Sequence, residues 1–176
     1  MKYIKEKREM MAELWELVDI NKKKTGKILV RESDMLIPEG MYHMVVEIWT
    51  KDSNGKILLT QRHPNKHFGL LWEASGGAMV AGEESIDAAQ RELKEETGIY
   101  MDKEHLQYLG CVIGSNWIME SYVCVLGEAE PKLQLQAEEV VDYKFVTVEE
   151  LEAWKDHMVD GPWKRFCQYK ELIMKA

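Results

Sequence analysis

The sequence predicts an α/β fold whose layers are arranged as helix, sheet and helix. Two observations lead to this class. Segments typical of strands lie on both sides of one amphipathic segment between Ser85 and Gly98, and two further helical patterns follow near the end of the chain. The 176 residues are sufficient for one domain with a substantial core.

Residues 1–40 are predicted to form an arm or hairpin that packs on the main domain. Residues 1–18 have a pattern that begins as a helix and becomes strand-like towards its end. Residues 22–30 contain a Thr-Gly turn signal and then a short apolar strand. The proline and glycine of residues 38–40 mark the break before the main domain, which we expect to span residues 41–176.

The strands of the main domain are predicted from β-branched and aromatic runs bounded by turn residues. A Ser-Asn-Gly turn predicts a hairpin between the first two strands. The predicted strands are residues 42–50, 56–62, 72–79, 106–114, 117–126 and 140–146. Helices are predicted at residues 86–97, 148–154 and 163–174. Thr147 and Glu150 are expected to form a capping box at the start of the second helix.

The helix at residues 86–97 carries two different faces. Ser85 is expected to cap its N-terminus, and Gly98 stands where a left-handed residue ends a helix. The face suited to packing on a sheet is formed by Ile86, Ala89, Leu93 and Thr97. Glu92, Glu95 and Glu96, at positions i, i+3 and i+4, crowd another face. Three adjacent carboxylates repel one another unless cations offset their charge, and an all-oxygen site suits Mg²⁺ or Mn²⁺.

Nine residues between Gly77 and Ile99 fit the pattern G-x5-E-x7-R-E-U-x-E-E-x-G-U, in which U is aliphatic. They are Gly77, Glu83, Arg91, Glu92, Leu93, Glu95, Glu96, Gly98 and Ile99. The pattern resembles the signature of the Nudix hydrolases, with no position missing. The resemblance implies a Nudix-type α/β/α sandwich with a mixed central sheet. It also implies an enzyme that splits a diphosphate linkage in a small nucleoside-diphosphate-type substrate by water attack on phosphorus.

The resemblance further implies a metal site on the helix. Glu92, Glu95 and Glu96 are the implied ligands of Mg²⁺, with Mn²⁺ as the alternative ion, and the ion neutralises the diphosphate and acidifies the bound water. A backbone carbonyl at Gly76 is a further candidate ligand. Arg91 is expected to fix the carboxylate rotamers by ion pairing.

Residues outside the helix are candidates for substrate binding and for the general base. Gln61 and Arg62, at the end of a predicted strand, are placed to meet a phosphate, and Gly77 lets the backbone approach it closely. Surface positions for Gln61 and Arg62 are an equal alternative. The general base is left open between a motif glutamate and a later one, for which Glu139 and its neighbour Glu138 are the candidates and Glu120 is weaker.

Two other functions stay open. The segment before the motif, residues 71–77, is similar to the branch of the family close to isopentenyl-diphosphate isomerases. Those isomerases have a catalytic cysteine and a metal-binding histidine where this chain has Gly76 and Ala78, and their glutamate helix is degraded. Both departures favour hydrolysis. A nucleotide-binding module without turnover is the second alternative, which the intact set of glutamates disfavours.

Composition limits the partners. With 31 acidic and 23 basic residues, the net charge is −8, which disfavours a nucleic-acid polymer or an anionic membrane as partner. A small phosphorylated substrate is compatible, because divalent ions can bridge two acidic groups. The sequence has no apolar run of membrane-spanning length and no signal peptide pattern, so a cytoplasmic protein is expected. Cys111 and Cys124 are expected to be buried thiols. The oligomeric state is left open, with a homodimer through residues 1–40 as one alternative.

Overall fold

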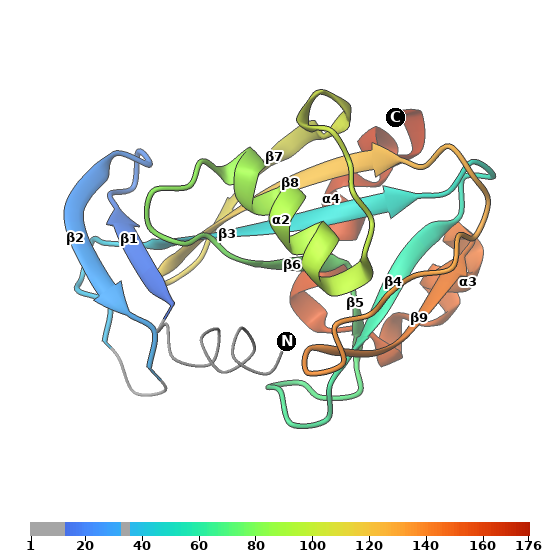
Figure 1. Cartoon of the computed structure of the whole chain (residues 1–176), viewed down its shortest axis with the longest axis horizontal. Coiled ribbons are helices and arrows are strands. Elements are labelled where there is room, and N and C mark those ends of the chain that lie inside the picture. Colours follow the sequence, from blue (N-terminus) through green and yellow to red (C-terminus); the bar gives the residue numbers. More distant parts are fainter. Residues whose placement is uncertain (1–12, 33–35) are drawn as a thin grey trace, which may run out of the picture.

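The computed structural model describes residues 13–32 and 36–176 (Figure 1). The sequence pattern interpreted as a helix within residues 1–18 falls mainly on residues 1–12, which lie outside the described residues. The strands are β1 Leu14–Val18, β2 Lys24–Val30, β3 His43–Lys51, β4 Ile57–Arg62, β5 Trp72–Glu73, β6 Ser75–Ala78, β7 Gln107–Ile113, β8 Trp117–Val125 and β9 Val140–Val146. The helices are α2 Ser85–Thr97, α3 Val148–Ala153 and α4 Asp160–Lys175, with short 3₁₀ turns η1 Lys103–His105 and η2 Lys155–His157.

The centre of the molecule is a mixed seven-stranded sheet. Its main path runs β5-β4-β3-β8-β7, with β6 paired to β3 and β9 paired to β4. β3 and β8 are parallel, whereas the other pairs in this sheet are antiparallel. The mixed α/β architecture inferred from the sequence is therefore confirmed.

Helices cover both faces of this sheet, and each face has its own apolar cluster. On one face, Ala88, Ala89 and Leu93 of α2 pack on Val46 and Ile48 of β3. On the other face, α3 and α4 pack on the sheet through a larger cluster (Figure 1). That cluster includes Trp49, Leu59, Trp72, Leu151, Phe166, Tyr169 and Ile173.

Two helix starts differ from the sequence prediction. α2 begins at Ser85 with Glu84 as the N-cap residue, and the Ser85 hydroxyl shares a hydrogen bond of 2.5 Å with the Tyr122 hydroxyl of β8 instead of capping the helix. α4 begins at Asp160 rather than at residue 163, because Pro162 falls in the first turn, where its missing N–H breaks no helical bond. The capping box of Thr147 and Glu150 is present as predicted.

The N-terminal hairpin is formed by β1 and β2, which pair antiparallel as a separate two-stranded sheet. It joins the rest of the fold at the start of β3, where Val18 and Tyr42 exchange two backbone hydrogen bonds of 2.9 Å. The Ala81 N–H also donates to the Leu14 carbonyl at 2.7 Å. This second contact brings β1 against the loop that precedes α2.

The cysteines are only partly as expected. Cys124 on β8 is buried, but Cys111 is exposed, because β7 is an edge strand of the sheet and Cys111 faces outward on it. None of the helices in the described parts of the chain is long and apolar enough to cross a membrane.

Candidate active site

The site is built around α2 and the strand that leads into it. β6 pairs with β3 so that Gly76 lies opposite Glu47 and Gly77 opposite Val46. α2 then packs its apolar face on β3 and ends at Gly98, which has the left-handed φ of 78° expected from the sequence. The glutamate face of α2 is thereby turned towards β6.

Gly76 and Gly77 are needed because other groups come very close to their backbone. A Cβ on Gly77 would lie 2.4 Å from a carboxylate oxygen of Glu92. A Cβ on Gly76 would lie 2.2 Å from the carbonyl oxygen of Val46. The first contact is with the end of a side chain and the second with rigid backbone, so the two glycines are needed for different reasons.

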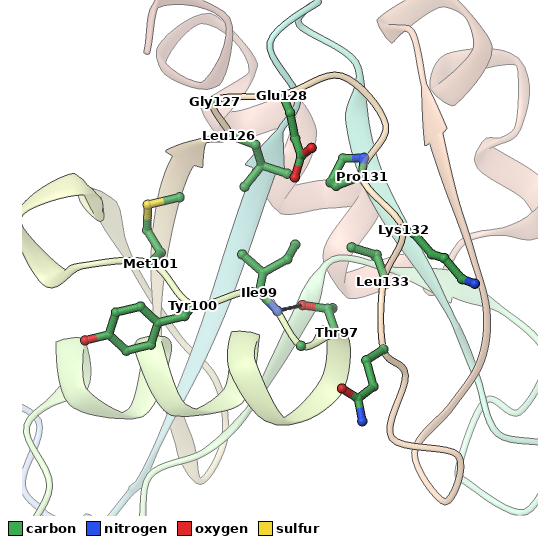
Figure 2. Close-up of a pocket in the computed structure, with 12 residues that line it drawn as sticks. Thr97, Ile99, Tyr100, Met101, Leu126, Gly127, Glu128, Pro131, Lys132 and Leu133 are labelled. Atoms are coloured by element: carbon green, nitrogen blue, oxygen red, sulfur yellow. Dashed lines mark hydrogen bonds between the residues drawn. The ribbon is translucent and has the colours of Figure 1, made fainter.

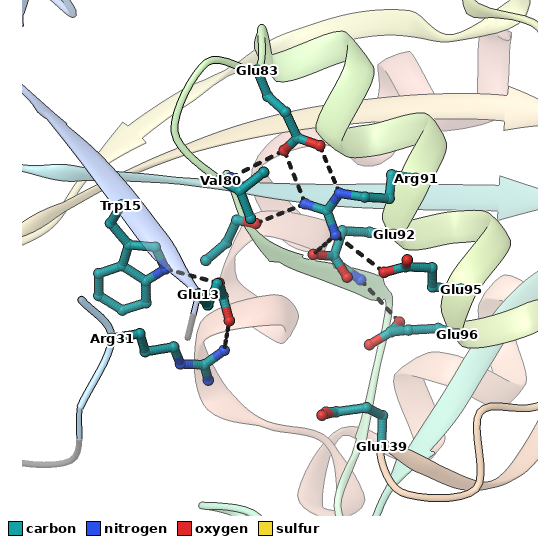
Figure 3. A network of polar contacts seen from close by, with 12 residues as sticks. Glu13, Trp15, Arg31, Val80, Glu83, Arg91, Glu92, Glu95, Glu96 and Glu139 are labelled. Atoms are coloured by element: carbon teal, nitrogen blue, oxygen red, sulfur yellow. Dashed lines mark hydrogen bonds and ion pairs between the residues drawn. The ribbon is translucent and has the colours of Figure 1, made fainter. Parts of the chain in front are cut away.

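Arg91 connects the carboxylates of the site (Figure 3). Its guanidinium donates to both oxygens of Glu83 at 2.7 and 3.0 Å, to Glu92 at 2.7 Å and to Glu95 at 3.2 Å. It also donates to the Ala78 carbonyl at 3.0 Å. Burial by itself would lower the pKa of Arg91, but the hydrogen bond and charge of Glu83 and the charge of Glu92 outweigh it and raise this pKa. Arg91 is therefore a permanently charged link between the loop and the helix.

Glu96 is the buried member of the cluster. Its carboxylate accepts a hydrogen bond of 3.1 Å from the Gly76 N–H. Burial, together with the charges of Glu73 and Glu92, raises the pKa of Glu96 to about 8. Burial also raises the pKa of Glu92. These shifts describe the protein without a cation, in which the carboxylates repel one another.

The donor set fits a hard divalent cation. Glu92, Glu95 and Glu96 offer carboxylate oxygens to one cleft, and Gly76 and Gly77 line the same cleft with backbone. The Cβ that is missing from Gly77 leaves the space which the Glu92 carboxylate occupies. Oxygen donors without sulfur or imidazole are the ligands that Mg²⁺ and Mn²⁺ prefer.

The cleft has a volume of about 940 Å³ and contains more than the motif. Arg62, Lys66, Gln136 and Glu139 line it from the sheet and the loops. Arg62 donates to the His67 carbonyl at 2.8 Å and forms an ion pair with Glu73. Lys66 forms an ion pair with Glu139.

Not all of the sequence candidates reach the cleft. Gln61 is absent from the cleft lining and donates to the Leu70 carbonyl at 2.9 Å. Glu120 is buried on β8 and pairs with Lys22 at 2.5 Å, outside the cleft lining. Glu138 is also absent from that lining, so among the late glutamates Glu139 alone faces the cleft within the described parts of the chain.

The hairpin contributes site residues that sequence reasoning missed. Glu13, Leu14, Trp15 and Arg31 line the cleft opposite α2, together with His43 at the start of β3. Lys66 was missed as well. The residue pattern of a strand does not predict which distant loop the strand will contact. From the sequence, only the apolar character of Leu14 and Trp15 could be recognised, and not their position in the cleft.

A second hollow of about 530 Å³ lies beyond the C-terminus of α2 (Figure 2). It is lined by the segment after Gly98 and by residues 126–134, with apolar side chains such as Ile99 and Leu133. The motif glutamates do not line it. The cleft beside Arg91 is therefore the candidate active site.

Comparison with known proteins places the chain in a family. A family model described as NUDIX domain matches residues 41–167. The chain belongs to this family. An uncharacterised Nudix hydrolase of Listeria monocytogenes is 33% identical over 143 residues, which are 80% of this chain and 83% of that protein. With this membership the protein is a pyrophosphohydrolase, an enzyme that acts on acid anhydrides.

Solved structures of other proteins share the fold. A structure from Deinococcus radiodurans has a TM-score of 0.74 at 20% identity and covers 89% of this chain and 99% of its own. A bifunctional NMN adenylyltransferase/ADP ribose pyrophosphatase of Francisella tularensis, complexed with AMP and a Mn ion, has a TM-score of 0.61 at 20% identity. That match covers 75% of this chain and 42% of the other.

Proposed function

We propose that this NUDIX protein hydrolyses the diphosphate linkage of a small nucleoside-diphosphate-type substrate with the help of a divalent cation. The observation that carries the proposal is that Glu92, Glu95 and Glu96 line one cleft, in which Arg91 holds the carboxylates of Glu92 and Glu95. A solvated acidic helix face would need neither the buried Glu96 nor the close approach of Gly77 to Glu92.

In this proposal the three glutamates and the Gly76 carbonyl hold Mg²⁺, or Mn²⁺ in its place. The bound ion would neutralise the diphosphate and lower the pKa of a water molecule. The protein's own residues bind and orient the substrate. Arg91 holds the rotamers of Glu92 and Glu95, and Gly77 leaves the space in which the Glu92 carboxylate lies against β6.

Arg62, at the end of β4, and Lys66, in the loop that follows, supply positive charge to the cleft. Each is paired with a carboxylate, Arg62 with Glu73 and Lys66 with Glu139. We propose that a phosphate oxygen competes for these cations, and that Lys66 then releases Glu139. Glu139 is our candidate for the general base, which would accept the proton of the attacking water at its carboxylate oxygen.

A substrate panel tests the function. Purified protein is assayed with nucleoside triphosphates, nucleotide sugars, ADP-ribose, dinucleoside polyphosphates and isopentenyl diphosphate, with Mg²⁺, Mn²⁺ or EDTA. Metal-dependent cleavage of the diphosphate linkage, detected by chromatography of the phosphate-ester products, is the expected result. Binding of nucleotides without turnover would instead identify a sensing module. Conversion of isopentenyl to dimethylallyl diphosphate would identify an isomerase, which we do not expect because Gly76 and Ala78 provide neither thiol nor imidazole.

The remaining proposals concern the cellular location, the partners and the domain organisation of the enzyme. We propose that it acts in the cytoplasm on small molecules, and not on nucleic-acid polymers or at membranes, in keeping with the net charge of −8. We also propose that residues 1–40 form an arm packed on a catalytic domain of residues 41–176. Light scattering after size-exclusion chromatography tests whether this arm also supports a homodimer.

A further inference from the structure

The N-terminal hairpin is fixed in place at the mouth of the cleft. The contacts that hold it include the backbone pairs of Val18 with Tyr42, the hydrogen bond between Ala81 and Leu14, and the ion pair of Lys22 with Glu120 at 2.5 Å. Ala81 belongs to the loop just before α2, so one of these contacts ties the hairpin to the catalytic motif itself. Residues on β1 and β2 therefore have defined positions relative to the glutamates.

Trp15 is the centre of a stack of flat groups on this hairpin. Its indole stacks on the His43 imidazole with the ring centroids 4.1 Å apart and the planes inclined by 8°. The guanidinium of Arg31 lies over the indole, 5.6 Å from the ring centroid. Both Trp15 and His43 line the cleft. The stack of imidazole, indole and guanidinium thus lines the space in which a substrate would lie.

Glu13 orients both partners of this stack. One carboxylate oxygen accepts a hydrogen bond of 2.8 Å from the indole Nε1, and the other accepts a bond of 2.6 Å from Arg31 (Figure 3). Stability alone explains this arrangement poorly, because the Arg31 side chain is 57% exposed and exposed ion pairs contribute little. In Figure 3 these side chains face Glu92, Glu95 and Glu96 across the cleft.

The chemistry of this surface selects one kind of group. A flat ring can stack on indole or guanidinium planes, and its edge can hydrogen-bond with Arg31 and Glu13. A hydrocarbon chain would instead bury the Arg31–Glu13 pair without replacing its hydrogen bonds with water. A diphosphate held at the glutamates would leave the rest of the same molecule facing the hairpin.

We propose that the N-terminal hairpin recognises the nucleobase of the substrate. In this inference, which rests on the proposed function, Trp15 and Arg31 contact the base, and Glu13 is a positioning residue that holds both. The hairpin lies before residues 41–167, which match the family model, so this recognition is a property of the chain's own N-terminal segment.

Binding measurements test the proposal without any turnover. AMP, GMP, CMP and UMP are titrated calorimetrically into the full-length protein in EDTA. At least one of them should bind, and Trp15→Ala should weaken that binding about tenfold or more, in line with base stacking on aromatic side chains. Trp15→Phe keeps a flat ring and should retain most of the affinity. Ile28→Ala, an exposed change elsewhere on the hairpin, is the matched control and should bind as the wild type does.

Kinetics separate recognition from a merely structural role. Trp15→Ala should raise KM for a nucleotide substrate and leave kcat nearly unchanged. KM for 5-phosphoribosyl 1-diphosphate, which has a diphosphate and no base, should stay the same. Three outcomes would each overturn the inference. Trp15→Ala could raise KM equally for both substrates, it could bind nucleotides as the wild type does, or the wild type could bind none of the four nucleotides. If the inference is overturned but the wild type still shows Mg²⁺-dependent turnover, the proposed function stands. If nucleotide binding depends on Trp15 but no substrate is hydrolysed, the proposed function alone fails.

Discussion

Glu95 is the motif glutamate that is most open to solvent, with 37% of its side chain exposed against 14% for Glu92. Its exposure gives it access to an ion and a substrate in the cleft, whereas Glu96 is buried against Gly76. Residues of one motif therefore stand in different environments, and substitutions at them should separate catalysis from folding.

Glu95→Gln should abolish most turnover and leave the fold intact. The change keeps the shape of the side chain but removes an anionic ligand from the proposed metal site. We expect kcat to fall about a hundredfold or more, equivalent to roughly 3 kcal/mol of transition-state stabilisation. The stability of the metal-free protein should be equal or slightly higher, because a charge leaves a repelling cluster. Steady-state kinetics at saturating Mg²⁺ and thermal unfolding in EDTA measure the two effects.

Glu171→Gln is the control for this variant, since Glu171 is an exposed glutamate of α4. It should match the wild type in both assays. Near wild-type turnover in Glu95→Gln would contradict the proposed role. A large drop in the melting temperature without metal would show that the carboxylate is structural.

The two glycines of β6 should respond differently to alanine. In Gly77→Ala the new methyl group meets the end of the Glu92 side chain, which can move, so folding should survive while turnover falls about tenfold or more. In Gly76→Ala it meets the Val46 carbonyl oxygen of the sheet, so the free energy of unfolding should fall by about 1–3 kcal/mol. Urea denaturation and kcat of both variants test the contrast, which fails if Gly77→Ala is the more unstable.

At the scale of elements, α4 is attached to the sheet by a buried ion pair. Arg165 donates to one oxygen of Glu47 on β3 at 2.7 and 3.0 Å, and the other oxygen accepts hydrogen bonds from Trp49 and Ser121. Glu47 also lies opposite Gly76 in the β3–β6 register. The residue to which α4 is attached is thus a direct neighbour of β6, the strand that leads into the site.

Arg165→Ala should be strongly destabilising, because it leaves the Glu47 carboxylate buried without its counter-charge. We expect a loss of about 3–5 kcal/mol in the free energy of unfolding, measured by denaturant titration. The double variant Glu47→Leu, Arg165→Met should recover part of this loss. Lys164→Ala, which removes an exposed ion pair with Asp160 on the same helix, should change stability by less than about 0.5 kcal/mol. A small effect of Arg165→Ala would mean that water reaches Glu47.

The elements were predictable where local chemistry decides them. β9 and the capping box of α3 match the sequence prediction because β-branched runs and the Thr147–Glu150 pair act over a few residues. Ser85 does not cap α2 as predicted, because its bonding partner Tyr122 lies elsewhere in the chain. For Gln61 the sequence left a surface position as an equal alternative, and its amide donates to the Leu70 carbonyl. The glutamate cluster was predictable from helical spacing alone. The opposite wall of the cleft depends on how the hairpin docks, and no periodicity specifies that.

At the scale of the whole molecule, the His43 side chain, on the first residue of β3, connects the sheet with Trp15 of the hairpin. Burial, and then the charge of Arg31, lower the pKa of His43 from 6.5 to about 4, against an opposing effect of Glu13. Its Nδ1 is buried and has no hydrogen-bond partner within residues 13–32 and 36–176. The folded protein therefore keeps this imidazole neutral under conditions in which the unfolded chain protonates it.

This difference makes stability depend on pH. Above pH 6.5 the His43 imidazole is neutral in both the folded and the unfolded state. Because its pKa is lower in the folded state, the unfolded chain takes up the proton first, and the free energy of unfolding falls as the pH drops from 6.5 towards 4. The contribution is at most about 3 kcal/mol. His43→Gln should flatten the decline in unfolding free energy over this range, relative to the wild type. His105→Gln, which replaces an exposed imidazole, should leave the slope as it is, and equal slopes in all three proteins would contradict the prediction.

Because the buried Glu96 lies beside the charges of Glu73 and Glu92, we expect cation binding at this site to raise the stability of the folded protein. A ligand that binds the folded chain and not the unfolded one shifts the folding equilibrium by mass action, about 2.7 kcal/mol at one hundred times its dissociation constant. The melting temperature should therefore climb with the logarithm of the Mg²⁺ or Mn²⁺ concentration and return to its starting value after chelation. Glu95→Gln should shift that titration to higher concentrations. The affinity of the metal site can in this way be measured before any substrate has been found.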